Sequence, residues 1–317
     1  MTGQVIAANT TATRVERYRQ AERALWEHYG MRPAERFVEL TSPAARLRVL
    51  EVGVGEPVLL VHGLIGPGGW APLVRELRGF RCLVLDRPGW GLSSSIDYSR
   101  YAYGSVTADL LAGVLDGLGI DRAHVIGASI GTLWALRLAA AYPSRVGRVA
   151  LMGSGPLLSE IGVPTVLRMI ASPLGALMVR RADADMLRSM LRQGGHAASL
   201  ADGRIPEEFV AWRVSASRDT DAMRSERDML RGGIINWTRP GLRTGLVFTD
   251  AELGAITHRT QYVYGTEDGS APIDFARRVV DVLPHGELLV VEGGGHEPWF
   301  EDANGVGSRV ARFLTQA

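Results

Sequence analysis

Hydrophobic residues recur along this chain with two different spacings. In residues 13–30 the apolar side chains follow a helical stripe that Glu22 interrupts midway, so we predict an amphipathic helix that packs on the rest of the chain. Residues 36–40 (RFVEL) and 45–53 (ARLRVLEVG) instead alternate polar and apolar positions across the turn sequence TSPA. That alternation predicts a β-hairpin.

Continuous apolar runs that end in glycine follow the hairpin, and such runs are typical of buried parallel strands. Segments with helical spacing separate most of these runs. The predicted strands are 57–63, 81–89, 124–129, 146–155, 259–265 and 286–295, and the predicted helices include 70–78, 104–118, 273–283 and 300–315. Repeated alternation of strand and helix predicts an α/β fold with a doubly wound, mostly parallel sheet.

The alternation stops in residues 156–249, which are rich in helix formers and methionine and contain no strand of the earlier type. We therefore expect an inserted helical cap there, placed as a lid over the functional edge of the sheet. The expected organisation is a helical extension (1–35), an α/β core (36–155 and 250–317) and the cap (156–249). The apolar residues of the cap, with Met186, Met190 and Trp237 among them, suit either a substrate pocket or the cap's own core.

Composition narrows the possible chemistry. The chain has 317 residues and a formal net charge of +1, and all 35 of its basic side chains are arginine. The absence of lysine excludes Schiff-base enzymes, Ser-Lys dyads and the phosphate-binding loop that needs Gly-Lys-Ser/Thr. The near-neutral balance gives no reason to expect a nucleic-acid partner.

Metal sites, disulfides and membrane segments find no support in the sequence. Cys82 is the single cysteine and lies in an apolar strand-like run, so we expect a buried thiol. No two histidines have a metal-ligand spacing, and we expect neither a metal nor a cofactor. The chain shows no apolar run of membrane-spanning length and no signal-peptide core, so we expect a cytoplasmic protein.

One serine stands between two glycines where a predicted strand meets a predicted helix. The segment GASIG places Ser129 between Gly127 and Gly131. A strand that turns sharply into a helix holds its first side chain up and exposed, and small residues on either side let that strained turn close. The junction therefore predicts a nucleophilic serine.

Four segments together resemble the α/β-hydrolase fold with a helical cap, from about residue 36 to the end. They are VHGLIGPGGW, DRPGWGLSS, GASIG, and the pair YGTEDGSAP and GGGHEPWFE. In that family the chain order is nucleophile, acid, base. The resemblance implies that Asp268 orients His296, which activates Ser129. Glu267 is the competing acid.

The resemblance also implies an oxyanion hole, which needs two backbone N–H groups. Ile130, after the nucleophile, would supply one and Leu64 the other, while His62 would shape the loop rather than transfer a proton. We expect the remaining histidines to be structural; they are His28, His124, His196, His258 and His285.

Fold alone does not fix the reaction. Carboxylic-ester hydrolysis through an acyl-enzyme, acting on an apolar small-molecule ester or related carbonyl compound, is the leading expectation. The runner-up is carbon–carbon bond hydrolysis of the aromatic-degradation type, although enzymes of that type commonly carry asparagine where this chain has Ala128. A third reading is a thioesterase whose acidic carrier protein would meet arginines of one cap helix (Arg180, Arg181, Arg188 and Arg192). The non-enzyme alternative is an inactive binding protein of the same fold.

Overall fold

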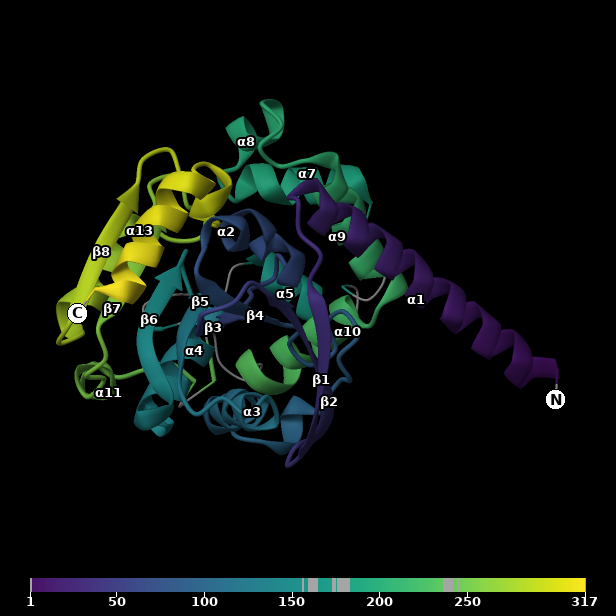
Figure 1. Ribbon diagram of the computed structural model, residues 1–317, viewed down its shortest axis with the longest axis horizontal. Helices are drawn as coiled ribbons and strands as arrows, with labels where there is room; N and C mark the ends of the chain where they lie inside the picture. The colour runs from purple at the N-terminus through teal and green to yellow at the C-terminus, as the bar shows by residue number, and fades with distance from the viewer. Residues whose placement is uncertain are drawn as a thin grey trace.

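A single mixed sheet of eight strands forms the centre of the computed structural model (Figure 1). The structure describes residues 2–155, 157–158, 165–172, 175, 183–235, 242–243 and 246–316, with the backbone alone for 2–11 and 165–166. The strands are β1 (Ala34–Thr41), β2 (Ala44–Val52), β3 (Glu56–Val61), β4 (Phe80–Leu85), β5 (Ala123–Ala128), β6 (Val146–Met152), β7 (Thr260–Gly265) and β8 (Gly286–Val291).

The strand order across the sheet is β1-β2-β4-β3-β5-β6-β7-β8. The predicted hairpin is present, because β1 pairs antiparallel with β2 from Ala34 opposite Glu51 to Thr41 opposite Ala44. β2 also runs antiparallel to β4, and every later pair is parallel. The prediction of a doubly wound, mostly parallel sheet is confirmed.

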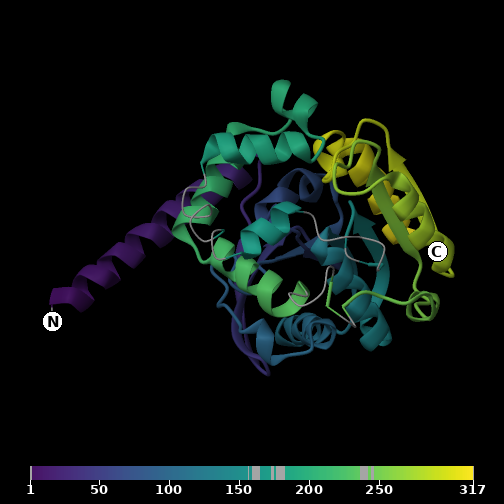
Figure 2. The same ribbon diagram turned by 180° about the vertical axis from the view of Figure 1, so that it is seen from behind.

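Helices cover both faces of the sheet (Figures 1 and 2). Alternate residues of each strand point to opposite faces, so Leu59 packs in the core under α3, α4 and α12, whereas Leu60 packs in the core under α1, α2 and α13. The bounds of these helices are Thr2–His28 (α1), Ala71–Glu76 (α2), Tyr103–Gly117 (α3), Ile130–Ala141 (α4), Ile273–Val282 (α12) and Ala303–Thr315 (α13).

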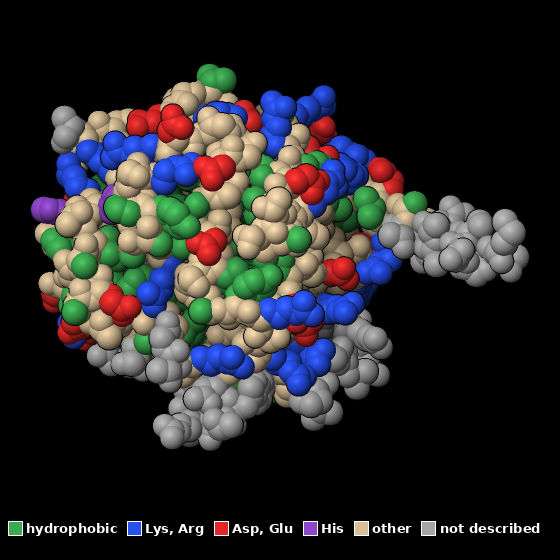
Figure 3. All heavy atoms as spheres, turned by 90° about the horizontal axis from the view of Figure 1, so that it is seen from below, with side chains coloured by type: hydrophobic (Ala, Val, Ile, Leu, Met, Phe, Trp, Pro, Cys, Tyr) green, Lys and Arg blue, Asp and Glu red, His purple; other side chains and the backbone are tan. Residues whose placement is uncertain are grey.

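Short helices complete the connections between these elements. They are η1 (Pro67–Trp70), η2 (Tyr98–Arg100), η3 (Pro143–Arg145), α11 (Asp250–Gly254) and η5 (Pro298–Phe300). None of the helices in the described part of the chain is both long and apolar enough to cross a bilayer. Seen from below, the surface carries arginine and carboxylate side chains interspersed with apolar ones (Figure 3).

Between β6 and β7 the chain leaves the sheet and forms a helical segment, which we call the insert. Its described elements are α5 (Thr165–Ala171), α7 (Ala184–Gln193), α8 (Ala197–Ala201), α9 (Glu207–Asp219), α10 (Ala222–Met229) and the π-helical turn η4 (Leu230–Ile234). On α7, Leu187 and Leu191 are buried, whereas Met186 and Met190 are half-buried. Trp237, Arg180 and Arg181 lie outside the described residues. The limits 156–249 stay a prediction.

Helix α1 lies along α9 of the insert, and its first residues point away from the body of the molecule (Figure 1). Tyr18, Leu25 and Trp26 are buried in the core on that side. Glu22, which interrupts the apolar stripe, is also buried, at 8% exposure. Its position is explained by a charged partner on the sheet.

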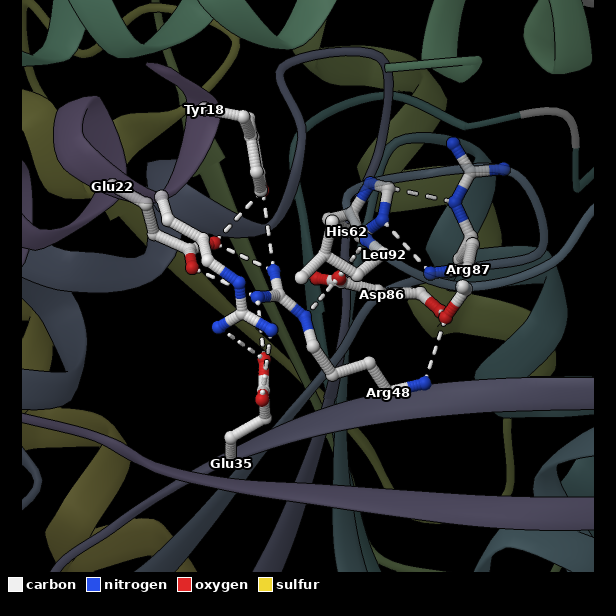
Figure 4. Close-up of polar contacts among 10 residues, drawn as sticks. Tyr18, Glu22, Glu35, Arg48, His62, Asp86, Arg87 and Leu92 are labelled. Atoms are coloured by element: carbon white, nitrogen blue, oxygen red, sulfur yellow. Dashed lines mark hydrogen bonds and ion pairs between the residues drawn. The ribbon is translucent and has the colours of Figure 1, made fainter. Parts of the chain in front are cut away.

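That partner is Arg48 of β2, which is fully buried among carboxylates (Figure 4). Its guanidinium donates to Glu22 at 2.6 and 2.8 Å and to Asp86, at the end of β4, at 2.6 Å. Tyr18 accepts another of its hydrogen bonds at 3.2 Å. Burial raises the pKa of Asp86 to about 6 even though Arg48 opposes the shift. The ion pairs therefore join α1 to the loop that leaves β4.

Candidate active site

Ser129 occupies a strained turn between β5 and α4. Its φ of 54° and ψ of −121° make it the single non-glycine residue with positive φ in the described part of the chain. A side chain on Gly127 would overlap the backbone of Gly131, and one on Gly131 would overlap the carbonyl of Val61. The two glycines thus let the turn close, as the sequence pattern predicts, and the strain is of the kind that holds a reactive side chain in place.

Asp268 and His296 meet at the ends of β7 and β8. The Nδ1 atom of His296 lies 3.0 Å from each carboxylate oxygen of Asp268. Asp268 also accepts the N–H groups of Ser154 at 2.8 Å and Ser270 at 2.9 Å. Burial alone would raise the pKa of Asp268, but the ion pair with His296 and these N–H donors lower it. Glu267, the competing acid, is exposed.

A short segment after β6 links the serine to this pair. The N–H of Ser129 donates to the carbonyl of Met152 at 3.0 Å. Gly153 is packed against the backbone of His296, and Gly155 is packed against that of Ser129. The hydroxyl of Ser154 lies 3.3 Å from both Asp268 Oδ1 and His296 Nδ1. Sequence reasoning missed Ser154, since only folding brings it beside these partners.

Folding therefore brings the three predicted triad residues onto adjoining segments of the chain, but no hydrogen bond joins the serine to the histidine. The hydrogen bonds of the described residues include none between the Ser129 hydroxyl and the His296 ring. Because Nδ1 of His296 faces Asp268, its Nε2 is the atom left for a proton from serine or substrate. In enzymes of this kind such a contact commonly tightens when substrate binds.

The loop after β3 lies beside the serine. A side chain at Gly63 would come within 2.6 Å of Ser129 Cβ, so this loop approaches the nucleophile closely. Leu64 follows Gly63 directly, and Ile130 begins α4 immediately after Ser129. The two predicted oxyanion donors are thus on the two backbone segments that border the serine hydroxyl.

His62 and Arg87 both form hydrogen bonds to the backbone of that loop. His62 is fully buried, and its Nε2 accepts the Arg87 N–H at 3.2 Å, so its Nδ1 carries the proton and donates to the Gly63 carbonyl at 2.7 Å. Burial and the neighbouring Arg87 charge keep the pKa of His62 well below its usual value. The ring is therefore neutral and structural.

Arg87 in turn joins the loop to the insert. Its Nη2 donates to the Gly63 carbonyl at 3.1 Å and to Glu226 of α10 at 3.0 Å. The indole N–H of Trp90 donates to the same Glu226 carboxylate at 2.8 Å. Figure 4 shows Arg87 beside His62 and on the far side of Asp86 from Arg48. The insert thus contributes a carboxylate that neutralises Arg87.

A second buried arginine of the insert, Arg213 of α9, also contacts the loop after β3. Its Nη2 donates to the Leu64 carbonyl at 3.1 Å, and its guanidinium lies 5.0 Å from the Trp90 ring centroid. It is 4% exposed, and burial lowers its pKa to about 10 although Glu226 opposes the shift. No carboxylate among the described residues forms an ion pair with it. Sequence reasoning missed this residue.

Acidic residues surround the candidate base. Burial alone would lower the pKa of His296, but the carboxylates of Glu297 and Asp268 outweigh that effect and raise the pKa to about 9. His196 of the insert, expected from sequence to be structural, contacts Glu297 at 2.9 Å and Glu301 at 2.7 Å. Among the described residues, no group of three or more acidic, histidine or cysteine side chains is arranged to hold a metal ion.

Comparison with known proteins identifies a family for this chain. The sequence profile described as the alpha/beta hydrolase fold matches residues 56–303. A 2-hydroxy-6-oxononadienedioate/2-hydroxy-6-oxononatrienedioate hydrolase of Paraburkholderia phymatum is 32% identical over 89% of this chain and 96% of its own length. A 2-hydroxy-6-oxo-6-phenylhexa-2,4-dienoate hydrolase of Burkholderia cepacia is 28% identical over 85% of this chain and 91% of its own length.

Solved structures share the fold at lower identity. The meta-cleavage product hydrolase CumD of Pseudomonas fluorescens IP01 superposes with a TM-score of 0.70 at 22% identity, covering 88% of this chain and 97% of its own. The carboxylesterase CesB of Bacillus subtilis gives a TM-score of 0.71 at 20% identity, covering 96% and 99%. At these identities the likeness supports the fold and leaves the reaction open.

Proposed function

The chain belongs to the alpha/beta hydrolase fold family, and on that premise we propose that it hydrolyses a carbon–carbon bond beside a ketone in a small molecule that also carries a carboxylate. This was the runner-up reading of the sequence. Relatives aligned over most of their length are named 2-hydroxy-6-oxononadienedioate/2-hydroxy-6-oxononatrienedioate hydrolase or 2-hydroxy-6-oxo-6-phenylhexa-2,4-dienoate hydrolase. Those names favour it over the leading expectation of ester hydrolysis.

The buried guanidinium of Arg213 is the structural feature that best supports the proposal. None of the described carboxylates forms an ion pair with the buried Arg213 guanidinium, and a buried charge without a counter-ion is costly in a folded protein. This guanidinium donates to the Leu64 carbonyl. An anionic substrate group would pair with it next to the proposed oxyanion hole. A simple apolar ester has no group that needs such a cation.

The proposed reaction uses the five residues of the predicted site. Ser129 Oγ adds to the ketone carbon while its proton passes to His296 Nε2, and Asp268 holds the charged ring. The N–H groups of Leu64 and Ile130 stabilise the oxyanion. The carbon–carbon bond then breaks, and its electron pair stays on the leaving fragment, which takes up a proton. Water hydrolyses the acyl-enzyme that remains.

The leaving group explains why an anion-binding cation matters. A carbon leaving group needs its negative charge to be delocalised. The 2-oxo tautomer of the dienol provides this, because the electron pair of the breaking bond then passes through the conjugated double bond to the ketone oxygen next to the carboxylate. A cation near the carboxylate stabilises that charge as it moves away from the breaking bond. The stabilisation is greatest where water is excluded, as around Arg213.

Ester hydrolysis remains the second candidate, and Ala128 favours it. Carbon–carbon hydrolases of this fold commonly carry asparagine before the nucleophile, and Ala128 is a buried small residue with no polar group to offer. Hydrolysis of an ester would use the same five residues, and the two reactions would differ only in the group that leaves.

The experiment that tests the proposal compares 2-hydroxy-6-oxo-6-phenylhexa-2,4-dienoate with p-nitrophenyl acetate. We expect the wild-type protein to cleave the dienoate with the higher kcat/KM. Arg213→Gln should lower kcat/KM for the dienoate by at least about thirtyfold, the effect of removing one partner of a buried charge pair. Turnover of the neutral acetate should change only a fewfold.

Arg218→Gln is the matched control, because Arg218 lies on the same helix but is exposed. This variant should cleave both substrates as the wild type does. A wild-type protein that cleaves the acetate and leaves the dienoate intact would refute the proposal and restore ester hydrolysis.

A further inference from the structure

The turn that follows α7 lies between the two loops that carry the candidate acid and base. It comprises residues 194–196 of the insert, directly after Gln193 at the end of the helix. A side chain at Gly195, whose φ is 94°, would overlap the carbonyl of Glu267 and the backbone of Gly295, and one at Gly269 would overlap the carbonyl of Gln193. The insert therefore packs by backbone against both loops.

One backbone hydrogen bond joins this turn directly to the candidate base. The N–H of His296 donates to the Gly194 carbonyl at 2.7 Å. Three glycines, Gly293 to Gly295, precede His296, and glycine gives a chain more conformational freedom than any other residue. The base thus follows a segment that has no side chains of its own to fix it.

His196 of the insert anchors this segment through two carboxylates. Its ring is fully buried, with Nδ1 2.7 Å from Glu301 Oε1 and Nε2 2.9 Å from Glu297 Oε2. The Phe300 ring packs against the His196 ring in a T-shaped arrangement, with the two ring centroids 5.4 Å apart. With a carboxylate at each nitrogen, the ring is held as an imidazolium that donates twice.

The charge of His196 agrees with this geometry. Burial alone would lower the pKa of His196, but the hydrogen bonds and charges of Glu297 and Glu301 raise it to about 9. The Glu297 N–H also lies 3.2 Å from Nε2. The carboxylate contacts at the two ring nitrogens, at 2.7 and 2.9 Å, are shorter than this backbone contact, and they favour the doubly protonated ring.

The carboxylates of Glu297 and Glu301 belong to the chain segment that contains His296. Glu297 follows His296 directly, and Glu301 accepts the Gly295 N–H at 3.1 Å as well as the Ser199 hydroxyl at 2.7 Å. His196 therefore fastens the residues before and after His296 to the insert. This clasp, formed by His196, Glu297 and Glu301, is separate from the Asp268 contact on the ring of the base.

We propose that His196 is a positioning residue for His296, which acts from the insert through Glu297 and Glu301. It holds the glycine-rich loop so that the imidazole of His296 faces Asp268 on one side and Ser129 on the other. Its positive charge also offsets Glu297, so that the charged groups facing His296 are Asp268, Glu297 and His196. The inference rests on the proposed roles of Ser129 and His296.

The test measures the rate at which a fluorophosphonate labels Ser129 between pH 6 and 10, a readout that does not depend on the natural substrate. In His196→Gln we expect labelling to slow by about tenfold to a hundredfold, the size of effect that a small misplacement of a catalytic group produces. The acidic limb of the pH profile should also move to higher pH, because Glu297 would then face His296 without its compensating cation.

Two further variants separate this role from a general loss of stability. Glu297→Gln removes the negative charge next to His296, so its acidic limb should move to lower pH. Ser199→Ala removes a hydrogen bond to the same Glu301 but leaves both ion pairs of His196, and its pH profile should match the wild type.

The outcomes are distinct. A folded His196→Gln protein with the wild-type labelling rate and pH profile would overturn the inference. So would a rate lowered equally at every pH together with a lower melting temperature, which is what a merely structural histidine would give. If the wild type itself is not labelled at Ser129, the proposed function fails instead.

Discussion

The imidazole of His296 faces Asp268 with its Nδ1 3.0 Å from both carboxylate oxygens. This symmetric contact fixes which ring nitrogen carries the shared proton and leaves the other free for chemistry. It joins two loops that follow different strands of the sheet, 28 residues apart in the chain. Substitutions that break the contact between Asp268 and His296 should therefore lower activity.

Replacing Ser129 with alanine should abolish turnover while the protein stays folded. Loss of a triad nucleophile typically costs on the order of a million-fold in kcat. Fluorophosphonate labelling should disappear, and the circular dichroism spectrum should be unchanged. Labelling that persists at another serine would show that Ser129 is not the nucleophile.

Asp268→Asn should be far more damaging than Glu267→Gln. The amide cannot hold the His296 ring in the required tautomer, a change that costs roughly ten-thousand-fold, whereas Glu267 is exposed. The kcat values of the two variants on the same substrate decide the matter. A larger loss in Glu267→Gln would assign the acid to that residue.

Activity should rise with pH through the alkaline range. The pKa of His296 is raised to about 9, and a general base works only when deprotonated. We therefore expect kcat/KM to increase from pH 6 and to level off above about 9. A profile that is flat between pH 7 and 9 would mean that the carboxylates around His296 do not control its proton in solution.

The stability of the insert should also depend on pH through His196. Its folded pKa of about 9 exceeds the ordinary value, so its contribution to folding is complete below about pH 6.5 and is lost as the pH rises through 9. The contribution is at most about 3 kcal/mol. The melting temperatures of the wild type and His196→Gln should differ at pH 6 and converge by pH 10. An equal difference at both pH values would contradict the charged form.

Arg48→Met should destabilise the protein by about 3–5 kcal/mol, because it leaves Glu22 and Asp86 as buried charges without their cation. Arg36→Met is the matched control: Arg36 pairs with Glu51 on the surface, where such pairs contribute about 0–1 kcal/mol. Denaturant unfolding of both variants measures the difference. Equal losses would show that α1 is not anchored through Arg48.

The fold could be predicted because its signals are local. Apolar runs that end in glycine, separated by helical segments, determine a doubly wound sheet, since each strand must bury both faces. The turn at Ser129 could also be predicted from the two flanking glycines, because a strained strand-to-helix junction needs small residues on either side. The order of nucleophile, acid and base came from the family resemblance, and the roles of these residues stay predictions.

Tertiary structure alone decided which polar side chains of the insert reach the site. Arg213 lies on α9 and His196 in the turn after α7, within a segment that the sequence marks only as rich in helix formers and methionine, and their partners are more than 100 residues away in the chain. Periodicity reports which face of a helix is buried, but not what that face meets. The docking of the insert on the strand ends sets those contacts, and likewise only the packing of α1 on the sheet gives Glu22 its partner Arg48.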